Sequence, residues 1–307
     1  MASTLCIAVI GGSGFVGTEL VSRLATAGHR LRVPSRHWSR TQHLAPLPTV
    51  ERLRLDVHQP AALRQLLQGC DVAINLVGIL NERGRSGEGF THAHTALTEK
   101  IIDACLTEGV TKLVQMSALG ADPSGPSHYL RSKGRAEALI RAAPATLDWS
   151  LLRPSVIFGA RDSLLNRFAQ LLRLSHGWMP LARAEARFAP IWVTDVAEAF
   201  ERCLQGSATR RQSFDLCGPR VMTLRELVEF TGEQIGIRSK VLPLPDSVGR
   251  AQAAIMDFVP GKPFSTDNFN SLTVDNVCQE SGLARLGITA TALETIAPTY
   301  LRRAHAP

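Results

Sequence analysis

Short apolar runs alternate with longer segments of helical periodicity through the first half of the chain. The apolar runs cover residues 5–10, 30–34, 50–56, 71–77, 112–117 and 149–153, and the helical segments cover residues 15–27, 60–67, 90–108 and 129–143. Strands that alternate with helices in this way predict a parallel sheet with helices on both faces. Because such crossovers are right-handed, we expect an α/β protein with a Rossmann-type, doubly wound parallel sheet whose ligand lies outside the carboxyl ends of the strands.

The alternation loosens after about Phe158, where segments that carry Pro and Gly interrupt the apolar runs. The predicted division is a first domain over residues 1–157, to which residues 188–218 return, and a smaller C-terminal lobe over residues 158–187 and 219–307. The returning part is expected to form a strand plus helix over 191–203 and a short strand over 214–217. Residues 290–303 have the spacing of an amphipathic helix that packs on a core.

A glycine-rich turn joins the first apolar run to the first helical segment. In its G-x-G-x-x-G pattern, a glycine at 11 or 12 allows a tight turn, Gly14 lets the backbone approach phosphate, and Gly17 lets the helix pack close to the strand. The helix N-terminus offers its N–H groups to a pyrophosphate. Residues 1–157 are therefore predicted to be an NAD(P)-binding Rossmann domain. The expected contacts in the turn are Gly11, Ser13, Gly14, Phe15, Val16 and Gly17.

The end of the second predicted strand selects between the two nicotinamide dinucleotides. An acidic side chain at this point, about twenty residues past the glycines, would bind a free ribose 2′-hydroxyl. This chain has Pro34, Ser35, Arg36 and His37 there, with no acid. Arg36, backed by Ser35, can neutralise a 2′-phosphate, so NADP(H) is favoured over NAD(H). The alternative is that Arg36 is an ordinary exposed loop arginine.

Two further strand ends are expected at the edge of the same cofactor crevice. Asp56 and Val57 end the third predicted strand, and Leu76, Val77 and Gly78 end the fourth. Asp56 could accept a hydrogen bond from the adenine amino group, and Gly78 would let the backbone approach the adenosine. Asp and Gly also start loops in many proteins, so simple turn chemistry is the alternative at both positions.

A tyrosine and a lysine four residues apart follow the fifth predicted strand, which ends at Ser117. Tyr129 and Lys133 would share one face of a helix and point into one crevice. An ammonium near a phenol lowers the pKa of the phenol, which makes the tyrosine a usable acid or base. Lys133 could also hold the nicotinamide ribose, and Ser117 could hydrogen-bond a substrate carbonyl or hydroxyl. We predict that these three residues are catalytic.

Together these motifs resemble the short-chain dehydrogenase/reductase superfamily, in its extended and atypical branch. The segment 152–159 resembles a family segment near the nicotinamide, which implies that Pro154 and Val156 contact the cofactor. The segment 190–197 resembles a strand-to-helix segment beside the substrate pocket. The stretches that carry a narrower resemblance, to bacterial relatives of the NAD(P)H-binding accessory subunit of mitochondrial respiratory complex I, are 75–80, 117–122, 166–168 and 298–301. That resemblance implies a tightly held NADPH and a fold that need not turn over.

The chain departs from the catalytic superfamily at one position. His92 aligns where an asparagine would complete the proton relay, and it could either relay protons or simply pack on its helix. The remaining predicted substrate residues are Arg161, Asn166, Arg167 and Trp192. These four side chains could line the pocket, but arginine and tryptophan there could also serve lobe packing or a partner contact.

Composition excludes several classes of protein. The 307 residues are 45% hydrophobic, enough for a large core, and the longest apolar stretches are too short to span a bilayer. Arginine supplies most of the formal net charge of +7, but no basic block is interleaved with aromatics, so we expect no nucleic-acid partner. The first apolar run is too short for a signal peptide. We therefore expect a cytoplasmic protein, with peripheral attachment at the inner membrane face as the alternative.

Six cysteines are scattered without a C-x-x-C pair, and most of them lie in apolar runs. We expect all six to be reduced and to act as small hydrophobic residues. His92 and His94 do not belong to a zinc-binding spacing, so no metal site is predicted.

Three functions stay open on these grounds. The first is an NADP(H)-dependent oxidoreductase that acts on a carbonyl or alcohol of unknown identity. The second is a non-catalytic NADPH-binding accessory or assembly factor of a membrane respiratory or quinone-related complex. The third is a nucleotide-sugar epimerase or dehydratase, in which Arg161 and Arg167 would contact the diphosphate.

Overall fold

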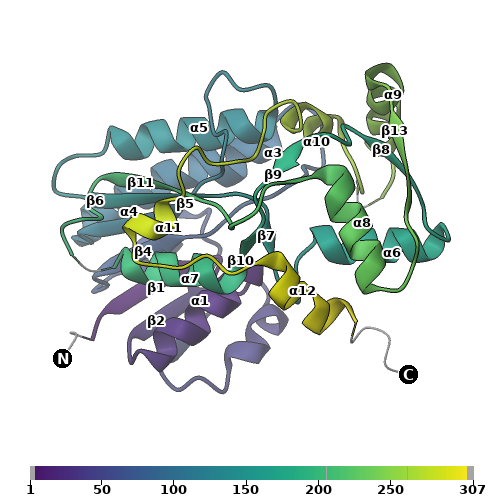
Figure 1. Ribbon diagram of the computed structural model, residues 1–307. Helices are drawn as coiled ribbons and strands as arrows, with labels where there is room; N and C mark the ends of the chain where they lie inside the picture. The colour runs from purple at the N-terminus through teal and green to yellow at the C-terminus, as the bar shows by residue number, and fades with distance from the viewer. Residues whose placement is uncertain (1–3, 205, 261, 303–307) are drawn as a thin grey trace.

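A seven-stranded parallel sheet forms the centre of the protein in the computed structural model, which describes residues 4–204, 206–260 and 262–302 (Figure 1). Its strands in spatial order are β11 (Gln212–Leu216), β6 (Asp148–Pro154), β5 (Lys112–Met116), β4 (Val72–Asn75), β1 (Cys6–Ile10), β2 (Arg30–Pro34) and β3 (Val50–Leu53). The chain order reverses between β1 and β4, which is the switch point of a doubly wound sheet. The predicted fold class is confirmed.

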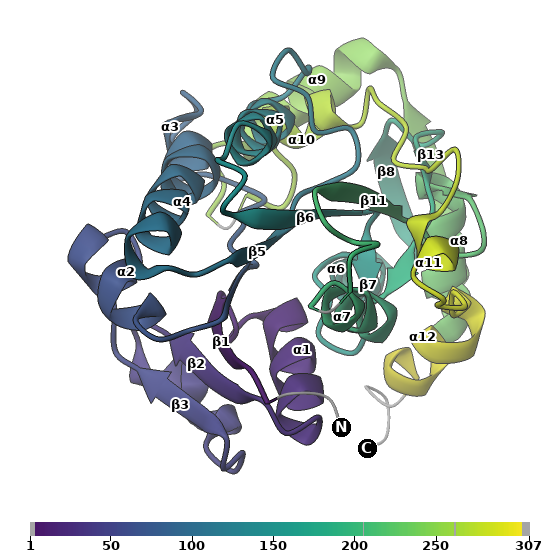
Figure 2. The same ribbon diagram turned by 90° about the vertical axis from the view of Figure 1, so that its left-hand side faces the viewer.

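Helices cover both faces of this sheet (Figure 2). On one face lie α1 (Phe15–Thr26) and α7 (Val193–Arg202), and on the other lie α2 (Pro60–Leu67), α4 (Leu97–Glu108) and α5 (His128–Arg141). Strand β1 shows why both faces are apolar: Ile7 and Val9 pack with α1 and α7, whereas Ala8 and Ile10 pack with α2 and α4. A fully buried strand of this kind reads as a continuous apolar run, which is the pattern in the sequence.

The helical segment predicted over residues 90–108 contains a local distortion. It consists of α3 (Glu88–Phe90), a π-helical segment η2 (Thr91–Ala96) and α4. A π-helical turn shifts the phase of the side chains by part of a turn, and such turns often occur at functional sites. The short 3₁₀ helix η1 (Trp38–Leu44) follows β2. Periodicity alone gave neither feature.

A second hydrophobic cluster builds the C-terminal lobe. It packs α6 (Leu164–Leu174), α8 (Leu224–Gln234) and α12 (Leu293–Leu301) with the parallel pair β8 (Trp178–Ala182) and β13 (Lys240–Leu244). The final helix is shorter than the predicted 290–303, and residue 303 lies outside the described residues. The remaining elements are β7 (Ile157–Phe158), β9 (Arg187–Phe188), β10 (Ile191–Trp192), β12 (Met222–Thr223), α9 (Asp246–Met256), α10 (Thr266–Ser271) and α11 (Gly282–Arg285).

Segment 188–218 joins both parts of the molecule. Strand β11 pairs with β6 at the edge of the central sheet, and α7 packs on α1. Strand β10 pairs instead with β7, in a separate two-stranded sheet. No helix in the described part of the chain is both long and apolar enough to cross a membrane.

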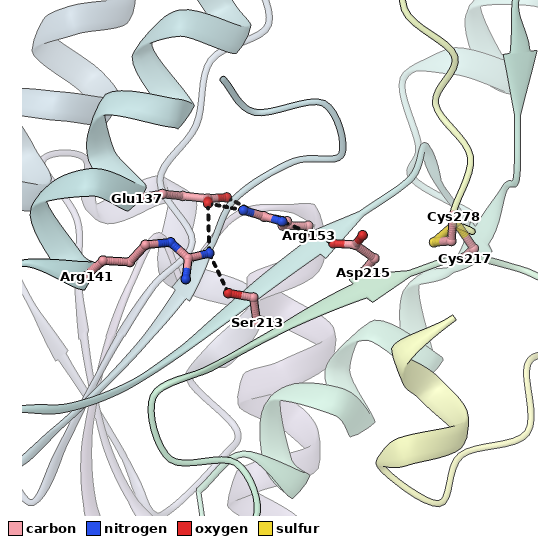
Figure 3. A network of polar contacts seen from close by, with 7 residues as sticks. All are labelled: Glu137, Arg141, Arg153, Ser213, Asp215, Cys217 and Cys278. Atoms are coloured by element: carbon pink, nitrogen blue, oxygen red, sulfur yellow. Dashed lines mark hydrogen bonds and ion pairs between the residues drawn. A yellow bond between two sulfur atoms is a disulfide. The ribbon is translucent and has the colours of Figure 1, made fainter. Parts of the chain in front are cut away.

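One pair of cysteines departs from the sequence prediction. Cys217, directly after β11, forms a disulfide with Cys278 across a sequence separation of 61 (Figure 3). The expectation that all six cysteines are reduced is therefore wrong for this pair. No spacing motif reveals it, because the two residues meet only where the chain around Asn276 folds back beside Phe188. The free, buried cysteines are Cys6, Cys70, Cys105 and Cys203.

A buried carboxylate fixes α5 to the sheet. Glu137 is 4% exposed and accepts hydrogen bonds from both Nε and Nη2 of Arg153 on β6 (Figure 3). Arg153 also lies 3.6 Å from the carboxylate of Asp215 on β11, and Arg141 of α5 donates to Ser213 of the same strand. The bidentate pair ties α5 to β6, and the Arg141–Ser213 bond ties the same helix to β11.

We predict that Glu137→Ala destabilises the protein by about 2–3 kcal/mol, because Arg153 is left half-buried without its main partner. The measurement is the free energy of unfolding in urea at pH 7. Glu294→Ala is the matched control, since it breaks an exposed ion pair with Arg220 and should cost less than about 1 kcal/mol. Equal losses in the two variants would contradict the prediction.

Candidate functional site

The carboxyl ends of the parallel strands gather the predicted cofactor residues along one edge of the sheet. The residues follow β1 (Gly11, Ser13, Gly14, Phe15, Val16 and Gly17), β2 (Ser35 and Arg36), β3 (Asp56 and Val57), β4 (Leu76, Val77 and Gly78) and β5 (Ser117), with Pro154 and Val156 at and after the end of β6. Their assignment as ligand contacts stays a prediction. Their common location follows from the parallel register of β1 to β6.

The glycine turn is built so that α1 starts against it. A side chain at position 17 would place its Cβ 2.3 Å from the Gly11 carbonyl oxygen, so only glycine fits this close approach. Gly11 has φ +86°, a conformation that favours glycine. Gly14 precedes the helix and offers no side-chain cap. The first-turn N–H groups of α1 are thus left without a side-chain cap, which is the condition for binding an anion.

Basic side chains lie near the carboxyl ends of β2 and β3. Arg36 is exposed and makes no ion pair within the described residues, while Ser35 Oγ hydrogen-bonds the backbone of His37. Burial lowers the pKa of His58, and the charges of His92 and Arg36 lower it further. The Asp56 carboxylate accepts the N–H of His58 and starts a turn. This is the turn role that the sequence left open as the alternative to adenine binding.

His92 and His94 have different surroundings. The ring of His92 is exposed and stacks on His58, with ring centroids 4.0 Å apart. His94, two residues on, is 1% exposed. Its Nε2 lies 3.7 Å from the point that a Cβ atom would occupy if Gly78 carried a side chain. The structure therefore puts His94, and not His92, beside the predicted catalytic lysine.

His94 is held as a neutral hydrogen-bond relay. Its Nε2 accepts the N–H of Ile79 at 3.1 Å, so its Nδ1 is the donor to Ser132 Oγ at 2.8 Å. Ser132 in turn donates to the Tyr129 carbonyl. Burial, with Lys133 nearby, lowers the pKa of His94 to about 2. The sequence identified both histidines, but their spacing did not show which faces the crevice.

The three predicted catalytic residues lie around the end of β5. Lys133 is 2% exposed and donates from Nζ to the carbonyl oxygen of Met116 at 3.2 Å. The Nζ atom is 3.4 Å from the point that a Cβ atom would occupy if Gly78 carried a side chain. Ser117, the next residue after Met116, is 4% exposed and its Oγ has no hydrogen-bond partner in the described residues. A buried hydroxyl without a partner is costly, so a ligand that pairs with it fits this site.

Tyr129 differs from the expectation about its ionisation. Its half-buried ring lies edge-on to Phe90 and His94, and no hydrogen bond to Lys133 is present among the described residues. Burial and then the carboxylate of Asp267 raise the pKa of Tyr129 to about 12. The predicted lowering by Lys133 does not occur in this structure, because burial and the Asp267 carboxylate both raise the pKa and Lys133 makes no contribution that opposes them.

Asp267 of α10 caps the helix that carries this tyrosine. Its two carboxylate oxygens accept the backbone N–H groups of His128 at 2.6 Å and of Tyr129 at 3.1 Å. Ser271 of the same short helix donates to Ser127, the N-cap of α5. The lobe thereby supplies both a cap and a negative charge to the site. Sequence reasoning missed Asp267, because no local pattern shows which carboxylate meets a helix 138 residues away.

The end of β6 is held by another residue that the sequence did not reveal. Asn276 Oδ1 accepts the N–H of Val156 at 3.1 Å and the hydroxyl of Ser155 at 2.8 Å. Pro154 is buried, and its carbonyl accepts the N–H of Leu119. The Val156 N–H therefore has a protein partner already.

The predicted substrate residues differ in their surroundings. Arg167 donates to the Pro263 carbonyl at 2.8 Å, and Asn166 Nδ2 donates to the carbonyl of Asp162. Trp192 is half-buried between the hydrophobic clusters of the sheet and of the lobe, which is the packing alternative. Arg161 is exposed, and its charge acts on His43 near α1. No group of three or more His, Cys, Asp or Glu placed to hold a metal occurs among the described residues.

Comparison with known proteins identifies the family. Residues 11–163 match a family profile described as NAD(P)H-binding. The alpha subcomplex subunit 9 of mitochondrial NADH dehydrogenase [ubiquinone] 1 from Arabidopsis thaliana is 30% identical over 298 residues, covering 92% of this chain and 73% of the plant protein. The chain belongs to the NAD(P)H-binding family of atypical short-chain dehydrogenases/reductases that contains this subunit. The resemblance stated from the motifs is confirmed.

Other proteins that are similar to this chain differ in the activities their names state. The 40 kDa subunit of NADH-ubiquinone oxidoreductase from Neurospora crassa is 26% identical over 255 residues, which are 81% of this chain and 65% of the fungal subunit. A ceramide reductase of Caulobacter vibrioides is 28% identical over 260 residues, 82% of this chain and 77% of that protein. A nucleoside-diphosphate-sugar epimerase structure from Staphylococcus aureus matches with TM-score 0.76 and 16% identity, over 97% of this chain and 100% of the epimerase. This last likeness shows the fold alone.

The buried lysine makes a prediction about stability and pH. Burial lowers the pKa of Lys133 from 10.5 to about 8, so the folded state releases this proton before the unfolded state does. The charge therefore destabilises the fold below pH 8, by about 3 kcal/mol, and this cost disappears as the pH rises to about 10.5. We predict that Lys133→Met stabilises the protein at pH 7, and that its advantage over the wild type shrinks at pH 10.

The measurement is the urea midpoint of both proteins at pH 7 and pH 10. Lys240→Met removes an exposed lysine and serves as the control, with little change expected at either pH. A Lys133→Met protein that is less stable than the wild type at pH 7 would sink the prediction.

Proposed function

We propose that this family member is an NADPH-dependent reductase of carbonyl compounds. The observation that carries the proposal is the buried hydroxyl of Ser117, which has no hydrogen-bond partner among the described residues. It lies near the buried ammonium of Lys133, at the edge of the sheet where the glycine turn also lies. A catalytic site is one place where a protein keeps such costly groups. The nicotinamide would supply the hydride, and the residues would bind and orient the reactants.

Each residue has a distinct role in this proposal. Lys133 would hold the nicotinamide ribose next to Gly78, and Ser117 Oγ would donate to the carbonyl oxygen of the substrate. Tyr129, whose pKa is raised to about 12, stays protonated near neutral pH and is set as a proton donor. Protonated tyrosine favours reduction of a carbonyl over oxidation of an alcohol. His94, buried behind Lys133, would position α5 through Ser132.

The preference for NADPH is supported by charge at the adenosine end. Arg36 makes no ion pair within the described residues, and Lys100 adds a second cation nearby, with its Nζ donating to the His58 carbonyl. A 2′-phosphate is a dianion near neutral pH and gains from such a cluster, whereas a free 2′-hydroxyl does not.

A second candidate function is supported by the relatives. The Arabidopsis and Neurospora proteins are subunits of a mitochondrial NADH dehydrogenase, so this chain could hold NADPH as a structural cofactor of a respiratory or quinone-related membrane complex. The fixed cap on α5 and the engaged Val156 N–H agree with a site that binds without turnover. Such a protein would lie at the cytoplasmic side of the inner membrane. The nucleotide-sugar alternative has less support, because Arg167 is engaged by Pro263.

Replacing Arg36 tests the cofactor preference. We predict that Arg36→Ala weakens NADPH binding by about tenfold to a hundredfold, because a charge-assisted contact to the phosphate is lost, and changes NADH binding little. Fluorescence titration of each dinucleotide measures both constants. Arg64→Ala, an exposed arginine on α2, is the control and should leave both unchanged. An equal loss for NADPH and NADH would rule out the proposed role.

Replacing Tyr129 separates the two candidate functions. We predict that Tyr129→Phe retains NADPH binding and lowers kcat at least about a hundredfold, because the proton donor is gone. The probes are a 3-oxoester and an aromatic diketone, with NADPH oxidation followed at 340 nm. Tyr300→Phe, the other tyrosine of the chain, is the control. Tight NADPH binding with no oxidation in the wild type would instead favour the accessory role.

A further inference from the structure

The outer face of α9 and the turn after it expose large apolar side chains. Its inner face packs Ala253 against Phe269 and Ala182 of the lobe. On the outside, Ile255 is 66% exposed and Phe258 is 75% exposed. The helix lies at the periphery of the molecule, at the end of the lobe away from the β3 edge of the sheet (Figures 1 and 2). Exposed apolar groups of this size, when clustered, mark an interaction surface.

The loop after β4 lies beside this turn and extends the same surface. Asn81 Nδ2 donates to the Lys262 carbonyl at 3.2 Å, and Lys262 Nζ donates back to the Gly84 carbonyl at 2.7 Å. The side chain of Asn268 donates to the carbonyl of Leu80, which is 58% exposed. We call residues 80–86, 255–260, 262 and 263 the docking surface.

All exposed charges on the docking surface are basic within the described residues. Arg83 and Arg85 are exposed, and Lys262 is half-buried. The two acids, Glu82 and Asp257, are each 8% exposed and turn inward. Glu82 accepts the backbone N–H groups of two glycines, at positions 87 and 89, and Asp257 accepts from Thr266.

The apolar and basic groups are interleaved at close range. The guanidinium carbon of Arg85 lies 5.3 Å from the centre of the Phe258 ring. The Nε atom of Arg85 lies 3.5 Å from a carboxylate oxygen of Asp257. An apolar tip surrounded by arginine and lysine matches the headgroup region of an anionic bilayer, where aromatic and aliphatic side chains insert and basic side chains pair with lipid phosphates. A protein partner would need an acidic rim and an apolar pocket of matching shape. The formal net charge of +7 on the chain adds a general attraction for anionic lipid.

We propose that the docking surface binds the protein peripherally to an anionic lipid bilayer. It would insert Ile255 and Phe258 and place Arg83, Arg85 and Lys262 at the headgroups. A cavity of about 110 Å³ is lined by residues of both segments, among them Asn81, Arg85, Asp257 and Lys262, and also by Phe90 and His128. Phe90 also contacts the ring of Tyr129, so docking would turn this side of the site toward the bilayer.

Vesicle co-sedimentation of the full-length chain tests the proposal without any activity readout. The vesicles are phosphatidylcholine alone and phosphatidylcholine with about 30% phosphatidylglycerol, a content high enough for a strong negative surface potential. We expect binding to the anionic vesicles that weakens as salt is raised, and little binding to the neutral ones. Ile255→Ser with Phe258→Ser should weaken binding to anionic vesicles at least about tenfold at unchanged net charge.

Two matched controls accompany that double variant. Leu174→Ser removes an exposed leucine at the end of α6 and should leave binding unchanged. Arg83→Gln with Arg85→Gln should reduce the anionic preference, whereas Arg135→Gln with Arg238→Gln, exposed arginines elsewhere, should reduce it less.

Several results would overturn the proposal. These are no binding to anionic vesicles, equal binding after the Ile255 and Phe258 substitutions, or an equal loss in the two arginine pairs. A wild-type dimer in light scattering that becomes monomeric on the serine substitutions would assign the surface to a second copy of the chain. None of these results depends on whether the protein reduces a carbonyl, so the proposed function would stand or fall separately.

Discussion

The buried ammonium of Lys133 is the constraint on which the candidate site depends. A lysine that is 2% exposed, with its Nζ bonded to one backbone carbonyl, can be kept only if the surrounding fold is strong enough to offset its desolvation. The structure meets this need with Glu137, one turn further along α5, whose charge favours the protonated lysine and whose carboxylate holds Arg153 of β6. Helix α5 therefore carries both a residue of the candidate site, Lys133, and a residue that stabilises the fold, Glu137.

Helix α5 is fixed at both ends by groups from distant parts of the chain. Asp267 of α10 caps its first turn, and the Glu137 and Arg153 pair holds its second half to the sheet. These contacts leave the helix little freedom to shift, so Tyr129 and Lys133 keep their positions without help from a ligand. Burial and then the charge of this cap raise the pKa of Tyr129 to about 12, so its phenol stays protonated near neutral pH.

Much of the site could be predicted because its parts follow strand ends. Parallel strands bring their carboxyl ends to one edge, so Arg36, Gly78 and Ser117 were correctly expected at that edge from their positions alone. The choice between His92 and His94 could not be predicted, since a π-helical segment sets which side chain faces inward. The direction of the Tyr129 pKa shift was also beyond the sequence, because it depends on burial and on a carboxylate from α10.

The sequence by itself determined the Rossmann-type sheet, the glycine turn and the identity of the residues at the strand ends, because hydrophobic periodicity and local turn chemistry act over a few residues. Only the tertiary structure decided that the outer face of α9 is exposed. It also decided the contacts made by the C-terminal lobe, which are the Asp267 cap, the bond of Asn276 to Val156 and the Cys217–Cys278 disulfide. These contacts join residues 61 to 139 positions apart, and no local pattern encodes which of many similar side chains will meet.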